Sequence, residues 1–195
     1  MMPLLPTSPG TLISALASKP QLVTLALDCL IAHGDLPGEV LILHTDARYH
    51  PTQSGLATLR AALPRDYPHL SSRYIELRNH DAPLRDVTAP DEVQAAFRTL
   101  YGEMRRLKQT SARVHLLISG GRRTLTVFGM AAAQMLFDDE DRLWHLPRTR
   151  RWRLPARCMP ARANGRASFP FRSSRGGDFR RSSMLCAILT ILFRP

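Results

Sequence analysis

The chain has 195 residues and a formal net charge of +11, from 27 basic and 16 acidic side chains. The excess charge is confined to residues 147–195, which hold twelve arginines and one acid, whereas residues 1–146 hold 15 basic and 15 acidic side chains. A general attraction of the whole protein to nucleic acid is therefore excluded, and such a partner would have to bind the final segment.

Several further classes are disfavoured. The first residues carry no positive charge and are interrupted by prolines, so we expect no signal peptide. The last apolar run, Met184–Phe193, has ten residues, about half of the ~20 that a membrane-spanning helix needs. Cys29, Cys158 and Cys186 lack metal-ligand spacing, which indicates incidental thiols in a reducing cytoplasm, with no zinc site and no cofactor.

The N-terminal part of the chain predicts a strand, a helix and a second strand, at residues 11–17, 21–33 and 39–44. Ser18 stands where a helix N-cap belongs, and Pro20 suits the first turn of the helix. Gly34 is expected to end that helix, because glycine readily adopts the left-handed conformation found there. The second strand is almost continuously apolar, as a strand buried on both faces should be.

The next elements continue the alternation. A helix at 53–63, stopped by Pro64, leads to a strand at 73–77 and a polar loop at 79–88. A long helix at 90–108 has acids in its first turn. A strand at 114–118, a helix at 124–137 and a last strand at 143–146 follow. This order predicts an α/β fold, a Rossmann-like three-layer sandwich with a mainly parallel sheet. We assign residues 1–146 to this one domain.

A glycine turn, Ser119–Arg123, lies between the strand at 114–118 and the following helix. This layout points backbone N–H groups and a helix N-terminus towards an anion. Gly120 and Gly121 let a ligand approach the backbone, while Arg122 and Arg123 can each donate two hydrogen bonds to a phosphate. The alternative is a plain β–α turn whose arginines are solvated.

Ligands of open parallel sheets bind beyond the carboxyl ends of the strands. This rule places other polar residues on the same edge as the glycine turn and strengthens the case for a site. The candidate ligand-binding residues are Ser18, Thr45, Asp46, Ser119, Gly120, Gly121, Arg122 and Thr124. We expect no metal site: His44, His50, His80 and Asp81 do not share an element at metal-binding spacing, and the acids at 138–141 fit a solvated helix end.

Residues 147–195 read poorly as a domain, because they are rich in Arg, Pro, Ser and Gly and show no periodicity before Met184. One interpretation is a disordered basic arm that binds DNA or RNA. The other, which we favour, is a GC-rich gene translated out of frame after Leu146. Resequencing around codon 147 tests it, since an intact reading frame would exclude the second interpretation.

Three stretches carry a resemblance to a known family: the segment around Ser18–Thr24 (SKPQLVT), the ISGGR turn, and Asp141–Leu146 (DRLWHL). Over about residues 12–146 the chain resembles the CRISPR-associated Rossmann-fold (CARF) family, and most closely its stand-alone ring nucleases. The resemblance implies a cytoplasmic homodimer of antiviral defence that binds cyclic oligoadenylate across its two-fold axis.

Ring nucleases cleave this messenger, usually cyclic tetra-adenylate, without a metal ion and so switch off type III CRISPR signalling. The ribose 2′-hydroxyl attacks the neighbouring phosphodiester. The resemblance implies that Ser18 and Arg123 are the catalytic residues, and that Gly120 and Gly121 cradle a phosphate. Arg123 stands where the family often has Lys, Lys19 follows Ser18 where Pro is common, and residues 147–195 do not match.

Two alternatives to the ring nuclease remain open. The chain could be a binding-only sensor of the same messenger, which the replacement of Lys by Arg123 favours. It could instead act on nucleic acid through its basic final segment. A truncation at Leu146 separates the last possibility from the other two, because it would remove only the salt-sensitive affinity for DNA or RNA.

Overall fold

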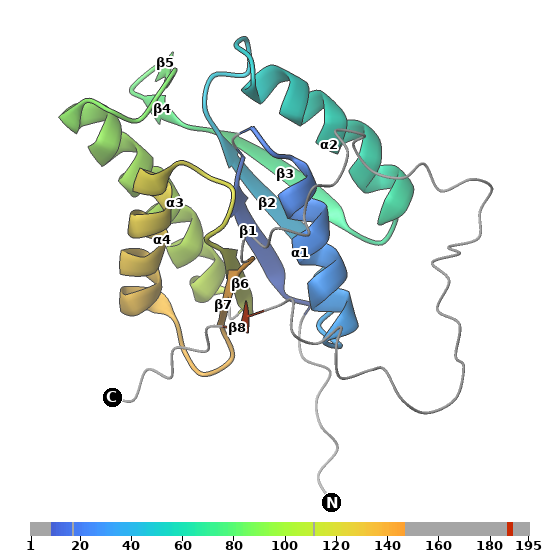
Figure 1. Ribbon diagram of the computed structural model, residues 1–195. Coiled ribbons are helices and arrows are strands. Elements are labelled where there is room, and N and C mark those ends of the chain that lie inside the picture. The colour runs from blue at the N-terminus through green and yellow to red at the C-terminus, as the bar shows by residue number, and fades with distance from the viewer. Residues whose placement is uncertain (1–8, 17, 111, 147–186, 189–195) are drawn as a thin grey trace, which may run out of the picture.

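The computed structural model describes residues 9–16, 18–110, 112–146 and 187–188, the last two by their backbone only. Over this part of the chain the elements form three layers, with one sheet between two pairs of helices (Figure 1). The Rossmann-like α/β prediction is confirmed.

The central sheet has the strand order β3-β2-β1-β6-β7-β8. Its members are β1 (Thr11–Ala15), β2 (Glu39–His44), β3 (Ser71–Glu76), β6 (Val114–Leu117), β7 (Arg142–His145) and β8 (Ala187–Ile188). The first five run parallel, and β8 pairs antiparallel with β7. A mainly parallel sheet was therefore predicted correctly, and β2 has the expected bounds.

Four helices cover the sheet: α1 (Gln21–Ala32), α2 (Thr52–Asp66), α3 (Pro90–Gln109) and α4 (Arg123–Leu136). α1 and α2 lie on one face, and α3 and α4 lie on the other (Figure 1). Two buried apolar clusters follow this division: Leu27 and Leu59 belong to the cluster under α1 and α2, and Ala96 and Ala132 to the cluster under α3 and α4. Apolar burial on both faces explains why the central strands are apolar at nearly every position.

Three local predictions were wrong. The N-cap of α1 is Pro20 with no side-chain hydrogen bond, so Ser18 lies in the preceding loop and caps nothing. Pro64 lies inside α2 instead of stopping it. Residues 79–88 are not wholly a loop, because β4 (Arg78–Asn79) and β5 (Ala82–Pro83) form a small antiparallel hairpin there.

The end of α2 shows why proline was a poor stop signal. A proline removes one backbone N–H, which matters little in a last turn that is held from outside the helix. Tyr67, which is 5% exposed, donates its backbone N–H to the Leu63 carbonyl at 2.9 Å. Its hydroxyl donates to Asp28 Oδ1 at 2.7 Å, so contact with α1 keeps the last turn of α2 in place.

The strand order creates a switch point between β1 and β6. From β1 the chain moves outward through β2 and β3, and it then returns to the other side of β1 to form β6 and β7. Loops after β1 and β6 consequently leave the sheet on opposite faces, which opens a crevice at their carboxyl ends. Ser18 and the glycine turn follow these two strands.

Some predictions lie outside the described residues. They include the disordered or out-of-frame character of residues 147–195, which stays a prediction.

Cys29, expected to be an incidental thiol, is disulfide-bonded in the structure. No helix in the described part of the chain is both long enough and apolar enough to cross a membrane.

Candidate functional site

The glycine turn lies at the switch point and packs against the end of β1 and the start of α1. Gly120 has a φ of 91°, a conformation that suits glycine. A Cβ on Gly121 would lie 2.7 Å from the Ala15 Cβ, and one on Gly120 would lie 2.6 Å from Leu22 Cδ1. The glycines thus allow close packing of the turn on β1 and α1, a role that the sequence did not indicate.

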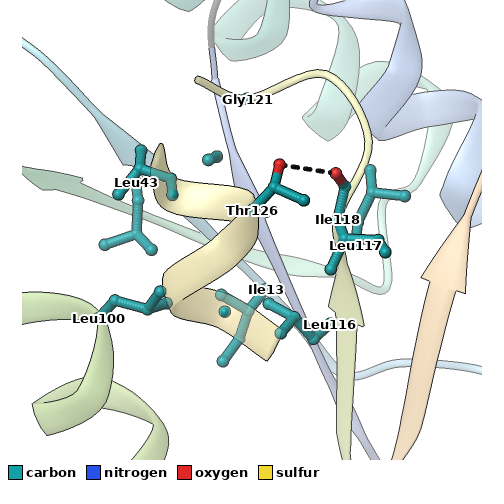
Figure 2. Close-up of a pocket in the computed structure, with 11 residues that line it drawn as sticks. Ile13, Leu43, Leu100, Leu116, Leu117, Ile118, Gly121 and Thr126 are labelled. Carbon is teal, nitrogen blue, oxygen red and sulfur yellow. Dashed lines mark hydrogen bonds between the residues drawn. The ribbon is translucent and has the colours of Figure 1, made fainter. Parts of the chain in front are cut away.

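The glycine turn leads directly into α4, and the N-terminus of this helix has no side-chain cap. Arg122 is the N-cap, with extended backbone and no capping hydrogen bond from its side chain. The Thr126 hydroxyl, in the first turn of α4, does not cap the helix either, because it donates at 3.0 Å to the carbonyl of Ile118, which follows β6 (Figure 2). The N-terminus of α4 therefore presents its partial positive charge to the crevice.

The cavity beneath α4 is not a ligand site. Figure 2 shows it lined almost wholly by apolar side chains from the sheet and from α3 and α4. Its volume is about 10 Å³, which is about the space of one water molecule. This cavity is therefore too small for an organic ligand, and the open surface lies at the strand ends.

Ser119 connects neighbouring strands. Its Oγ accepts the Leu146 N–H at 2.8 Å and lies 3.1 Å from His145 Nδ1. The side chain thus fastens the end of β6 to the end of β7. This structural role accounts for Ser119 without a ligand.

Ser18 and Arg123 are both exposed at the switch point. Arg123 is the first residue of α4, and within the described part of the chain no carboxylate pairs with its side chain. Ser18 belongs to the β1–α1 loop, which follows the strand next to β6 in the sheet. Both predicted catalytic residues are thus accessible and lie at the switch point.

Arg122 extends the site towards β2. Its guanidinium pairs with Asp86 at 2.5 Å, and Nη2 donates to the Arg85 carbonyl at 3.5 Å. Asp86 Oδ1 also accepts the Val87 N–H at 2.6 Å. Arg122 therefore joins the glycine turn to the loop that precedes α3. Thr124, in the first turn of α4, is half-buried.

Thr45 and Asp46 follow β2 and are both buried. The Thr45 hydroxyl lies 2.9 Å from the Thr52 hydroxyl. Asp46 pairs with Arg48 at 2.6 Å, and this hydrogen-bonded guanidinium lowers the pKa of the Asp46 carboxyl to about 2. Asp46 is thus a permanent negative charge that shapes the loop after β2.

A polar cavity of about 460 Å³ opens at the end of β2. It is lined by Thr45, Asp46, Tyr49, His50, Pro51, Thr52, Arg85, Asp86, Glu92 and Arg122. The structure therefore brings three predicted residues together, Thr45, Asp46 and Arg122. Sequence reasoning missed Tyr49, His50 and Arg85 as lining residues; the one signal for Tyr49 is an aromatic side chain in the loop directly after a buried strand.

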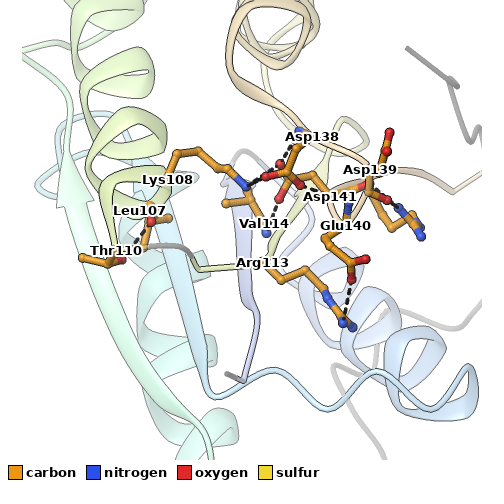
Figure 3. A network of polar contacts seen from close by, with 10 residues as sticks. Leu107, Lys108, Thr110, Arg113, Val114, Asp138, Asp139, Glu140 and Asp141 are labelled. Carbon is orange, nitrogen blue, oxygen red and sulfur yellow. Dashed lines mark hydrogen bonds and ion pairs between the residues drawn. The ribbon is translucent and has the colours of Figure 1, made fainter. Parts of the chain in front are cut away.

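The acidic run is a structural turn. Asp141 Oδ1 accepts the Val114 N–H at 2.7 Å, and Lys108 Nζ lies 2.7 Å from Asp138 and 2.8 Å from Asp141 (Figure 3). We name residues 138–141 the acidic turn. No group of three or more His, Cys, Asp or Glu residues in the described ranges is arranged to hold a metal ion.

The parallel sheet and the switch point in its strand order define a Rossmann-like α/β protein. The chain belongs to the family described as CRISPR-associated protein NE0113, whose model matches residues 19–162. The predicted membership among CRISPR-associated Rossmann-fold proteins is confirmed. The matched range runs past residue 146, into the segment that we assign outside the domain.

A solved structure of TM-score above 0.5 shares the fold. Csm6 of Enterococcus italicus bound to cyclic hexa-2′-fluoro-hexa-dAMP matches with a TM-score of 0.52 and 11% identity, over 71% of this chain and 33% of that protein. A type III CRISPR defence DNA nuclease activated by cyclic oligoadenylate matches with a TM-score of 0.46 and 17% identity, over 73% of this chain and 19% of that one. The matched region therefore covers about a third of the Csm6 chain and less than a fifth of the DNA nuclease. No curated protein matches the chain.

Proposed function

We propose that the protein binds cyclic oligoadenylate, with cyclic tetra-adenylate as the preferred ring, and cleaves it as a metal-independent ring nuclease. The observation that carries the proposal is the switch point, where the glycine turn, the uncapped N-terminus of α4 and the exposed side chain of Arg123 meet. Family membership and the fold shared with a Csm6 that holds a cyclic nucleotide ligand support it. A helix N-terminus with adjacent arginine suits a phosphodiester.

The chemistry needs only substrate groups and positioned charge. The ribose 2′-oxygen attacks the adjacent phosphorus and loses its proton to solvent. The bond from phosphorus to the 5′-oxygen breaks, and the leaving 5′-oxygen takes up a proton from solvent. The products are a 2′,3′-cyclic phosphate and a 5′-hydroxyl. In this scheme Ser18 holds the ribose or phosphate in line, and Arg123 stabilises the negative charge that develops on the phosphate.

A binding-only sensor is the second candidate. A guanidinium spreads its charge over a planar fork, whereas an ammonium concentrates it at one point, so Arg123 does not reproduce the geometry of the lysine it replaces. Under this alternative the messenger binds with the same contacts but remains intact. The experiment below distinguishes the two, because it measures both binding and turnover.

A homodimer forms part of the proposal. Val127 is 62% exposed and Met130 is 36% exposed on α4, the helix that begins with Arg123. Exposed apolar side chains beside a site favour burial against another surface. Sedimentation of the protein with and without cyclic tetra-adenylate measures this directly.

The test incubates the purified full chain with labelled cyclic tetra-adenylate in excess EDTA. We expect linear products ending in 2′,3′-cyclic phosphate, and about 10²-fold slower turnover for Arg123→Ala and for Ser18→Ala. Arg105→Ala is the matched control, since it removes an exposed arginine from α3. Arg123→Lys restores the residue that the family often has and should retain or raise turnover.

Other results would change the conclusion. If wild type and Arg123→Lys both bind cyclic tetra-adenylate tightly but form no product, the protein would be a binding-only sensor. Absence of binding to the wild-type chain would overturn both functions.

A further inference from the structure

The polar cavity at the end of β2 is not explained by the phosphate chemistry of the switch point. Three carboxylates line it, from Asp46, Asp86 and Glu92, against the guanidinium groups of Arg85 and Arg122. Asp86 already neutralises Arg122. Arg48 likewise neutralises Asp46. The cavity therefore has no surplus positive charge to attract a cluster of phosphates, and its occupant should be a largely neutral group.

The Tyr49 ring lies near two cations, and the nearer one, Arg85, lines the cavity, whereas the Arg48 guanidinium lies 5.9 Å from the ring centre. The Arg85 guanidinium lies 4.4 Å from the centre of the Tyr49 ring, which is a favourable cation–π distance. In the described part of the chain no carboxylate pairs with Arg85. Arg85 is exposed and Tyr49 is 43% exposed, so this pair offers a flat, partly open surface.

The backbone fixes the two partners opposite each other. Asp46 donates its N–H to the Leu84 carbonyl at 2.8 Å, which joins the loop after β2 to the loop before α3. The Asp46 carboxylate accepts the Arg48 N–H at 2.9 Å, and this bond shapes the turn that leads to Tyr49. The pair is therefore assembled from loops far apart in sequence, which these hydrogen bonds join.

We infer that the Arg85–Tyr49 pair is a stacking platform for one nucleobase of the bound ring, which would make these residues determinants of specificity. The inference rests on the proposed function. Guanidinium planes and aromatic rings are the surfaces on which proteins stack unpaired bases. The volume of about 460 Å³ falls within the range of small-molecule sites, and the polar lining offers donors and acceptors to the edge of a base.

The same geometry assigns the remaining parts of the ligand. Arg122 lies between the cavity and the glycine turn, with its guanidinium on Asp86 and its backbone at the start of α4. A nucleotide with its base in the cavity would direct its phosphate towards the turn. The platform and the switch point would thus bind different ends of one nucleotide.

The test is calorimetric titration of the full chain with cyclic tetra-adenylate. We expect Tyr49→Ala and Arg85→Ala each to weaken binding about tenfold or more, because stacking of a base contributes about 1–3 kcal/mol. Tyr49→Phe keeps the ring and should bind within about twofold of wild type. Arg105→Ala controls for the lost charge. Both truncated side chains are well exposed, so folding should persist.

Two outcomes would overturn the inference while the proposed function stands. The first is unchanged affinity in both alanine variants. The second is weaker binding by Arg85→Ala together with unchanged affinity of Tyr49→Ala, which would indicate that Arg85 contacts a phosphate and not a stacked base.

A second titration separates this inference from the proposed function. If wild type does not bind the cyclic ring, adenosine monophosphate is titrated while the Tyr49 ring signals are followed by NMR. Shifts of those signals, absent in Arg85→Ala, would support the base platform although the proposed function has failed. Unshifted signals would overturn the platform as well.

Discussion

The two turns at either end of α4 differ in how their polar groups are used. In the acidic turn Asp141 accepts hydrogen bonds from two backbone N–H groups, and Lys108 pairs with Asp138 and Asp141. In the glycine turn the helix N-terminus has no side-chain cap, and Arg123 is exposed. The contrast teaches that charge which the fold has already neutralised supports stability, whereas charge left open at a strand end is available to a ligand.

The largest effect should come from the acidic turn. Asp141→Ala removes a side chain with 0% exposure and leaves the Val114 N–H without its acceptor and Lys108 with one partner fewer. We expect the free energy of unfolding to fall by about 3–5 kcal/mol, measured by urea denaturation. The exposed neighbour Asp139→Ala is the control and should change it by less than about 0.5 kcal/mol. Equal effects of the two variants would contradict the comparison.

A pH-dependent loss of stability of similar size should come from His115 on β6, the strand that begins beside the acidic turn and leads into the glycine turn. Burial lowers the pKa of His115 from 6.5 to about 4, and its Nδ1 accepts the Trp144 indole N–H at 3.1 Å. The unfolded chain therefore binds this proton more readily than the folded one, so the stability fully present above pH 6.5 is lost as the pH falls towards 4. The loss should approach about 3 kcal/mol.

Urea denaturation between pH 7 and pH 4 measures this dependence. His115→Gln, which retains an acceptor for Trp144, should be less stable overall but show a shallower slope between pH 6.5 and 4. Parallel curves for the two proteins would show that another group is responsible.

A smaller effect should come from the glycine turn itself. Gly121→Ala places a Cβ 2.7 Å from the Ala15 Cβ, so the turn and β1 must move apart. We expect a loss of about 1–3 kcal/mol in unfolding free energy, together with weaker binding of cyclic tetra-adenylate.

The matched control for Gly121→Ala is Gly102→Ala. Gly102 is exposed on α3, and a Cβ there meets no atom within 4 Å. The better helix propensity of alanine should stabilise the protein by up to about 1 kcal/mol and leave binding unchanged. If the two substitutions gave the same result, the glycine turn would not be closely packed.

Sequence patterns predicted those features that depend on neighbouring residues. The apolar run at β2 and the helix-ending Gly34, with a φ of 83°, are set by local burial and backbone sterics. Prediction failed at Pro64, where a hydrogen bond from Tyr67 to α1 outweighs a local stop signal. Local preference is a weak guide wherever a tertiary contact holds the chain.

The candidate site was predicted in part for the same reason. The glycine turn is visible as strand, glycines and helix within a dozen residues. The polar cavity is not, because one backbone hydrogen bond between Asp46 and Leu84 joins its two halves. Ser119 was assigned to a ligand since its bond to Leu146 crosses between strands and leaves no trace in the local pattern.

The strand order also determines when the site can form. β1 pairs on one side with β2, close in sequence, and on the other with β6, where Thr11 lies opposite Val114. A ribosome therefore releases β1, β2 and β3 well before the strand that completes the switch point. During synthesis one edge of β1 stays unpaired and open to mispairing or to a chaperone, and closing so long a loop slows folding.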